Sequence, residues 1–265
     1  MTSALTVVRA VTDYAPADLA VPGDPIGWQL GDPAADVHRV LVTLDVRPEV
    51  VAEAIAGNYD LIVAHHPLVF RPARNLDERN PQNAMYAELL RHNIGVFGAH
   101  TNLDNANPGM NDWLAADLGL TSVTPFIEAG ELAGMGRIGE LPTPITLTAF
   151  ANQCQTTWHL QGLRAIAADL TQPVQRIAIL GGSGAEVYPD ALEAGADVLI
   201  TGDVSYHTGH DILASGIAVL DVGHHVEHVM KQHLTTILNA RNEKDGWGIT
   251  IAPSRLNTDP FTFMN

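Results

Sequence analysis

Short apolar runs alternate with helix-like patterns along most of the chain, and this alternation restricts the fold more than any other feature. The runs "RVLVTLD" (39–45), "DLIVAHH" (60–66) and "IGVFGAH" (94–100) are typical of buried strands. Residues 47–57 and 83–93 lie between them and have helical spacing; the first of these two segments has a proline in its first turn and a glycine at its end. Such alternation is typical of an α/β protein.

The second half of the chain repeats this rhythm. Apolar runs indicate further strands, and helical spacing indicates further helices; the strands fall within 134–141, 175–184, 197–203 and 216–225, and the helices within 145–158 and 226–240. "DLIVAHH" followed by "NIGVFGAHTNLD" resembles "DVLITGD" followed by "SGIAVLDVGHH", which suggests either a duplication or the general likeness of α/β strands. We therefore predict two similar, interlinked α/β lobes, 1–125 and 126–265, that meet near 121–131.

Composition excludes several kinds of partner. The formal charge is −16, from 30 acidic and 14 basic residues, so the surface should repel nucleic acid and anionic membranes. No apolar run approaches the roughly 20 residues that cross a bilayer, and the first residues lack the basic and apolar regions of a secretory signal. We therefore expect a cytoplasmic protein. The one cysteine, Cys154, excludes an intramolecular disulfide and cysteine-based zinc modules.

Polar side chains suited to metal binding follow three of the predicted strands. Ligands of α/β sheets bind just beyond the carboxyl ends of strands, and "AHHP", "AHTNLD" and "DVGHHVE" stand at such positions. In the first, His65 and His66 end an apolar strand and Pro67 helps to fix a turn, so two neighbouring imidazoles can reach two neighbouring metal ions. The alternative is that one of them lies at the surface, because adjacent residues of a strand face opposite sides.

The second strand end carries a carboxylate. Asp104 is placed to bridge two dications if the preceding histidine pair binds them, and an ordinary carboxylate at a helix start is the alternative. His100 better suits a supporting or substrate-binding role.

The third strand end offers several possible ligand pairs. His224 shares a helical face with Glu227, three residues later, and with His228, four residues later. His225 and His228 are also three residues apart. Spacing alone therefore leaves the choice of ligands open.

Two further motifs have less specific chemistry. Asp203 and His207 in "TGDVSYHTGH" could transfer protons, contact substrate or cap the next helix. "GGSGAE" (181–186) lacks the lysine and hydroxyl residue of a P-loop, so it is better interpreted as a tight turn.

The order of these motifs resembles the Nif-three-like family, whose members are often labelled GTP cyclohydrolase type 2 homologues. The resemblance extends from about Ile26 to the C-terminus and rests on "GDPIGWQLGD", "LIVAHHPLVF", "GAHTNLDN", "GRIGEL", "LGGSGAE", "ADVLITGDVSYH", "DVGHHVEHVMK" and "NTDPF". One departure is "GDPIG", where the family more usually has "WDNVG". The chain also lacks the inserted domain that some relatives carry.

The resemblance implies a hexameric, ring-shaped α/β protein with a two-metal site in each subunit. The family's metal ligands correspond to His65, His66, Asp104, His224 and Glu227. In some relatives the glutamate comes four residues after the histidine, where this chain has His228, so His228 stays open as an alternative ligand and Asp203 as a supporting residue.

These features together predict a dinuclear metal-dependent hydrolase, with its metal site at the C-terminal ends of strands between the lobes. Two divalent ions (Zn, Fe, Mn, Co or Ni) would activate water to attack GTP or another phosphorylated or cyclic small molecule, with His207 and His100 transferring protons. The alternative is a non-catalytic metal-binding, metal-delivery or scaffold protein built as a hexameric toroid.

Overall fold

Two α/β units, each built around its own sheet, make up residues 2–264, which are the residues described by a computed structural model. Within this range, unit 1 comprises residues up to Ala106 and a return segment, Met230–Thr258. Unit 2 comprises Asn107–Val229 and the residues from Asp259 onward. The predicted α/β class is confirmed. The chain crosses from one unit to the other several times, whereas the sequence predicted a single boundary between residues 125 and 126.

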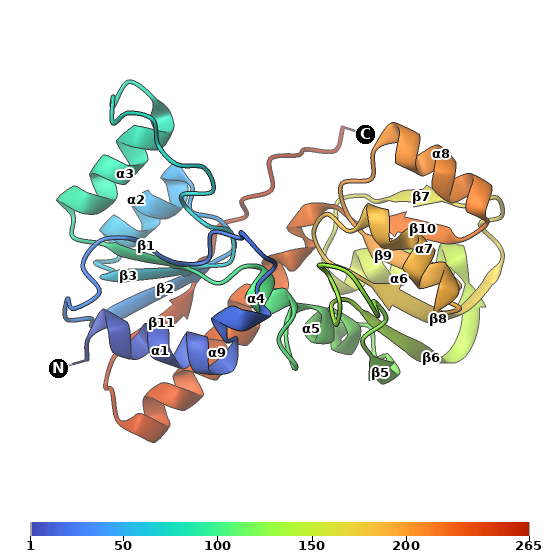
Figure 1. Ribbon diagram of the computed structural model, residues 1–265, viewed down its shortest axis with the longest axis horizontal. Helices are drawn as coiled ribbons and strands as arrows, with labels where there is room; N and C mark the ends of the chain where they lie inside the picture. The colour runs from blue at the N-terminus through green and yellow to red at the C-terminus, as the bar shows by residue number, and fades with distance from the viewer. Residues whose placement is uncertain (1, 265) are drawn as a thin grey trace. The chain divides into compact units, whose positions relative to one another are not determined.

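Unit 1 has a five-stranded sheet with the order β1-β4-β3-β2-β11, in which only β1 runs antiparallel to its neighbour. The strands are β1 (Gly27–Leu30), β2 (Arg39–Thr43), β3 (Leu61–Ala64), β4 (Gly95–Gly98) and β11 (Thr250–Pro253). The helices are α1 (Ala4–Tyr14), η1 (Ala17–Leu19), α2 (Pro48–Ala56), α3 (Pro81–Arg91), α4 (Thr101–Asp104) and α9 (Met230–Asp245). Figure 1 shows α2 and α3 on one side of this sheet and α1 and α9 on the other. Because helices cover both sides, β3 is buried along its whole length.

Unit 2 has a six-stranded sheet with the order β5-β6-β8-β9-β10-β7. The strands are β5 (Thr121–Thr124), β6 (Arg137–Thr146), β7 (Arg164–Ile166), β8 (Pro173–Ile179), β9 (Val198–Thr201) and β10 (Ala218–Asp221). The helices are α5 (Met110–Asp117), α6 (Leu147–Thr157), η2 (Ala185–Val187), α7 (Tyr188–Glu193), α8 (Tyr206–Ser215) and η3 (His224–Val229). The parallel core of β8, β9 and β10 is flanked by antiparallel strands, so the unit is a mixed sheet.

The two sheets repeat one arrangement. Three consecutive parallel strands, β2-β3-β4 in unit 1 and β8-β9-β10 in unit 2, are each followed in the sheet by one antiparallel strand. One aspartate also has the same role in both units. The Asp60 carboxylate accepts the backbone N–H groups of His38 and Arg39, and Asp197 accepts those of Gln175 and Arg176. The sequence likeness around "DLIVA" and "DVLIT" therefore extends to hydrogen bonding, which favours duplication over a chance likeness.

The segment predicted as one helix over 226–240 differs from the prediction. A 3₁₀ helix, η3, comes first, and the α-helix α9 starts only at Met230. Residues three apart in a 3₁₀ helix lie directly above one another, whereas in an α-helix they are offset. This difference decides which side chains of "GHHVEHV" lie together.

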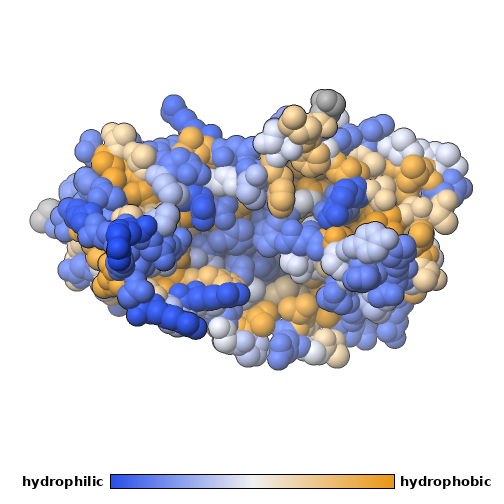
Figure 2. Space-filling model, turned by 90° about the horizontal axis from the view of Figure 1, so that it is seen from above, coloured by the Kyte–Doolittle hydropathy of each residue, from blue (hydrophilic) through white to orange (hydrophobic). Residues whose placement is uncertain are grey.

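Hydrophilic residues cover much of the face seen in Figure 2, with apolar residues scattered among them. None of the helices within residues 2–264 is long and apolar enough to cross a membrane.

Candidate metal centre

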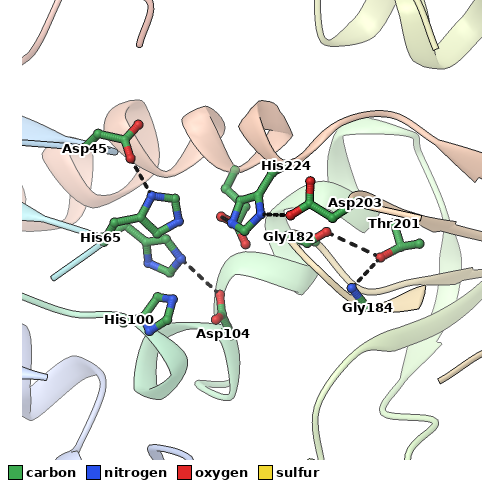
Figure 3. A network of polar contacts seen from close by, with 12 residues as sticks. Asp45, His65, His100, Asp104, Gly182, Gly184, Thr201, Asp203 and His224 are labelled. Atoms are coloured by element: carbon green, nitrogen blue, oxygen red, sulfur yellow. Dashed lines mark hydrogen bonds and ion pairs between the residues drawn. The ribbon is translucent and has the colours of Figure 1, made fainter. Parts of the chain in front are cut away.

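The loops after β3 and β4 bring histidines and a carboxylate together in unit 1. His65 and His66 directly follow β3, while His100 follows β4 and precedes α4, which ends at Asp104. The His65 side chain is fully buried, and its Nε2 lies 3.5 Å from Oδ1 of Asp104 (Figure 3). Because β3 and β4 are neighbouring parallel strands, their carboxyl ends meet at the same edge of the sheet.

The imidazoles of His65, His66 and His100 form one group in unit 1. The ring of His65 lies 5.0 Å from that of His66 and 5.1 Å from that of His100, and the last two rings are 5.6 Å apart. One ring nitrogen from each histidine lies within 4.8 Å of the other two, so the group could hold a metal ion. His100, for which the sequence suggested a supporting or proton-transfer role, is thus also placed where a ligand could be.

The Nδ1 atom of each of these imidazoles is held by an oxygen. Nδ1 of His65 lies 2.8 Å from the carbonyl oxygen of Ala99, Nδ1 of His66 lies 2.7 Å from Oδ1 of Asp45, and Nδ1 of His100 lies 2.8 Å from Oδ1 of Asp24. A carbonyl or carboxylate oxygen can only accept, so Nδ1 donates in each case. A neutral ring in this tautomer has its lone pair on Nε2, which is the form that binds metal.

The two carboxylates that hold Nδ1 atoms are themselves fixed by hydroxyl groups. Oδ2 of Asp45 accepts the hydroxyl of Thr258 at 2.5 Å. Oδ2 of Asp24 accepts both the backbone N–H and the hydroxyl of Thr101. Burial acts to raise the pKa of Asp24, but the hydrogen bonds from Thr101 and His100 outweigh it and hold that pKa below its usual 3.8. Asp24 therefore carries a negative charge against His100 at neutral pH.

Unit 2 contributes a histidine–glutamate pair from η3. Nε2 of His224 lies 3.3 Å from Oε2 of Glu227, and the glutamate is buried. The two residues are three apart in a 3₁₀ helix, which aligns their side chains. Nδ1 of His224 lies 2.7 Å from Oδ2 of Asp203, which follows β9 (Figure 3). The pattern of unit 1, an oxygen on Nδ1 and a carboxylate near Nε2, is thus repeated here.

His228 lies with a different neighbour. Its ring is 5.0 Å from that of His225, also three residues away, and its Nε2 lies 3.4 Å from the carbonyl oxygen of Trp158. In this geometry the carboxylate of Glu227 lies beside the Nε2 of His224.

Asp203 and His207 of "TGDVSYH" lie in different environments. Asp203 holds Nδ1 of His224, as a supporting residue would. His207 is exposed on α8, with its ring edge-on to Tyr206 at 5.5 Å. "GGSGAE" forms a tight turn at the end of β8, in which the Thr201 hydroxyl accepts the N–H of Gly184 and donates to the carbonyl of Gly182 (Figure 3).

Two carboxylates of unit 1 were missed at the sequence level, Asp24 and Asp45. Asp45 is the last residue of the predicted strand 39–45, as His66 is of the predicted strand 60–66, so its position at a strand end was an available signal. Asp24 lies in "GDPIG", ahead of all the predicted strands, and only folding brings it to His100. This contact gives that segment a structural role.

The donor set fits a divalent transition metal ion or zinc. Such ions bind the imidazole nitrogen of a histidine whose other ring nitrogen donates to an oxygen, and they also bind carboxylates. Both kinds of ligand are present among these residues. The fold and these residues define a mixed α/β protein with a group of histidines and carboxylates that could bind metal.

Comparison with known proteins identifies the family. Residues 3–260 match the family model of Duf34/NIF3 (NGG1p interacting factor 3), so the chain belongs to this family. It is 41% identical over 258 residues to a protein of Streptococcus pneumoniae, covering 96% of this chain and 97% of the relative. It is 40% identical over 250 residues to a protein of Lactococcus lactis, covering 94% of each. Both relatives are named GTP cyclohydrolase 1 type 2 homolog.

Solved structures agree with this assignment. A Bacillus cereus protein related to NIF3 superposes with a TM-score of 0.93 at 26% identity over the whole of both chains. A hypothetical protein of Staphylococcus aureus has a TM-score of 0.93 at 29% identity over 99% of both chains.

Proposed function

We propose that this protein is a metal-dependent hydrolase that binds two divalent metal ions per subunit. The proposed ligands are His65, His66, Asp104, His224 and Glu227. The observation that carries the proposal is the hydrogen bonding of the histidines. In every proposed imidazole ligand an oxygen holds Nδ1, which leaves Nε2 as the atom with a lone pair. Structural histidines have no need of the same tautomer at each position.

The chain's own residues have distinct roles in this proposal. Asp104 and Glu227 would supply the carboxylate ligands of the metal ions, and each lies within 3.5 Å of an imidazole Nε2. When bound, a pair of divalent ions lowers the pKa of a water molecule and stabilises negative charge on a substrate oxygen. His100 is proposed to take up and return a proton at Nε2, because Asp24 holds its Nδ1 and so leaves the lone pair of the neutral ring on Nε2. His207 is the second proton-transfer candidate.

The proposed substrate is GTP or another phosphorylated or cyclic small molecule. The names of the curated relatives are the reason to test GTP first. The formal charge of −16 would oppose the binding of an anion, so the positive charge of bound dications would be needed to attract one.

Metal analysis followed by a substrate screen tests the proposal. Purified protein is expected to contain close to two divalent ions per chain, and protein without metal after reconstitution would contradict it. GTP and a panel of phosphoesters are then incubated with wild type and with Asp104→Asn. The matched control is His38→Ala, because the His38 side chain is 73% exposed and lies outside the ligand set. Bound metal without turnover of any compound would favour the alternative of a metal-binding, metal-delivery or scaffold protein.

We further propose a ring-shaped homohexamer, which rests on the family resemblance. Light scattering after gel filtration should then give about six times the chain mass of 28.3 kDa. A mass of one or two chains at micromolar concentration would contradict this assembly.

A further inference from the structure

The glycine turn after β8 lies directly against the histidine–glutamate pair of unit 2. Gly182 has a φ of +69°, and a Cβ added to it would lie 2.5 Å from Oε1 of Glu227 and 3.4 Å from Nε2 of His224. Van der Waals contact between a carbon and an oxygen requires more than 3 Å, so no other residue fits while Glu227 keeps its place.

We propose that Gly182 is the positioning residue of Glu227: its missing side chain leaves the space in which the carboxylate lies beside His224. This positioning of Glu227 depends on the folded chain alone and not on bound metal. Its consequence for metal binding rests on the proposed function, since it assumes that His224 and Glu227 are ligands.

The turn itself is held in place from several directions, so it cannot easily yield to a larger residue. The N–H of Gly181 donates to Oδ1 of Asn111 at 2.9 Å, and the carbonyl of Gly182 accepts the N–H of Gly202 at 2.8 Å. The N–H of Gly184 donates to the Thr201 hydroxyl at 2.8 Å. A methyl group at position 182 would therefore displace the glutamate side chain and leave the turn where it is.

The other glycines of the turn differ from Gly182 in what an added Cβ would contact. A Cβ at Gly181 would meet Leu114 at 3.0 Å, but the oxygen of Glu227 only at 3.6 Å. A Cβ at Gly184 would meet Leu180 and Thr201. Gly182 is thus the position of this turn at which a side chain would meet the carboxylate first. Because ligand geometry must be held to about half an ångström, a displaced carboxylate should bind metal poorly.

The experiment compares Gly182→Ala with Gly119→Ala. Gly119 also lies in unit 2 and has a φ of +70°, but a Cβ there would have nothing within 4 Å. Both variants therefore strain the backbone alike, and only the first adds a contact with Glu227. Metal-free crystal structures should show the Oε2–Nε2 distance between Glu227 and His224 lengthened in Gly182→Ala and unchanged in Gly119→Ala. Affinity for Zn²⁺, measured by chelator competition, should fall at least about tenfold in Gly182→Ala relative to Gly119→Ala.

A double-mutant cycle keeps the proposal testable if Gly182→Ala folds poorly. Glu227→Asp is one methylene shorter and withdraws the carboxylate, whereas Glu227→Gln keeps the length. In metal-free protein, the drop in melting temperature caused by Gly182→Ala should shrink in the Glu227→Asp background and persist in the Glu227→Gln background.

The outcomes separate the two proposals. An unmoved Glu227 in the Gly182→Ala crystal, or equal melting-temperature losses in all three backgrounds, would overturn the positioning role. If wild type binds no Zn²⁺, the proposed function fails, while the metal-free crystals and the double-mutant cycle still decide the role of Gly182.

Discussion

Units 1 and 2 share an arrangement of strands but carry different side chains at the ends of those strands. Unit 1 gathers three imidazoles at the ends of β3 and β4, whereas unit 2 pairs the imidazole of His224 with the buried carboxylate of Glu227 on a 3₁₀ helix after β10. The histidines also differ in burial, since the side chain of His65 is 0% exposed and that of His224 is 35% exposed. One arrangement of strands can thus be kept while the loops at its strand ends acquire different chemistry.

Both units have buried apolar residues, and unit 2 also has an ion pair with a buried arginine. Unit 1 has a large apolar cluster in which α2 and α3 pack on β3 and β4. Unit 2 contains an ion pair in which the buried Arg137 of β6 donates to both carboxylate oxygens of the partly buried Asp112 on α5. The same arginine donates to the carbonyl groups of Gly134 and Gly136. Loss of the Arg137 charge should therefore lower the stability of unit 2 more than loss of a surface charge lowers the stability of unit 1.

The largest expected effect comes from breaking the Arg137–Asp112 ion pair. Arg137→Met should lower the free energy of unfolding by about 3 kcal/mol, because the partly buried Asp112 carboxylate loses its charged partner and two backbone carbonyls lose a donor. Arg91→Ala is the control in unit 1, where Arg91 pairs with Glu78 and Glu88 at the surface, and it should cost less than about 1 kcal/mol. Urea unfolding measures both. Similar losses of unfolding free energy for the two variants would show that the Arg137–Asp112 pair contributes no more to stability than a surface ion pair does.

Removal of one imidazole from each unit tests the difference in burial. His65→Ala and His224→Ala should each weaken metal binding by on the order of 100-fold if both histidines are ligands. Only His65→Ala should also lower stability of the metal-free protein, by about 2 kcal/mol, because it leaves a cavity in a packed region. Chelator competition and thermal unfolding of metal-free protein separate the two effects. Unchanged metal affinity in either variant would remove that histidine from the ligand set.

The carboxylates that accept hydrogen bonds from histidine Nδ1 atoms should affect metal affinity in both units, though less than the ligands themselves do. Asp45→Asn and Asp203→Asn keep the side-chain volume and weaken the hydrogen bond that orients His66 or His224. Metal affinity should fall by about 10- to 100-fold in each. We expect the greater loss at Asp45, which is also fixed by Thr258. Isothermal titration with Zn²⁺ provides the comparison, and a greater loss at Asp203 would contradict this ranking.

The smallest effect concerns acid stability and unit 1 alone. Because the folded-state pKa of Asp24 lies below 3.8, its ionised form stabilises the fold above that pH, and this contribution is lost as pH falls through the folded-state value. Asp24→Asn should therefore lower stability at pH 7 by about 1 kcal/mol. Its deficit should shrink below pH 4. Melting temperatures of both proteins from pH 7 to pH 3 test this; a deficit independent of pH would show that the charge of Asp24 is not responsible.

The sequence was most informative where structure is local. Strands β2, β3, β4, β9 and β10 fall where apolar runs end in polar residues, and α2 begins at Pro48 and is capped by Gly57. His65, His66 and Asp104 were singled out because they follow such runs. His224 and Glu227 were also identified, but spacing could not separate Glu227 from His228, since an α-helix and a 3₁₀ helix align different residues.

What the sequence alone determined is the class of fold, the family and the kinds of side chain at the strand ends, because these depend on short-range periodicity and motifs. What only the tertiary structure decided are contacts between distant segments. Asp24 reaches His100 across 76 residues, Thr258 reaches Asp45 across 213, and the return of α9 and β11 to unit 1 has no local signal. Periodicity reports which face of an element is buried, whereas the partner across that face is chosen by packing of the whole chain.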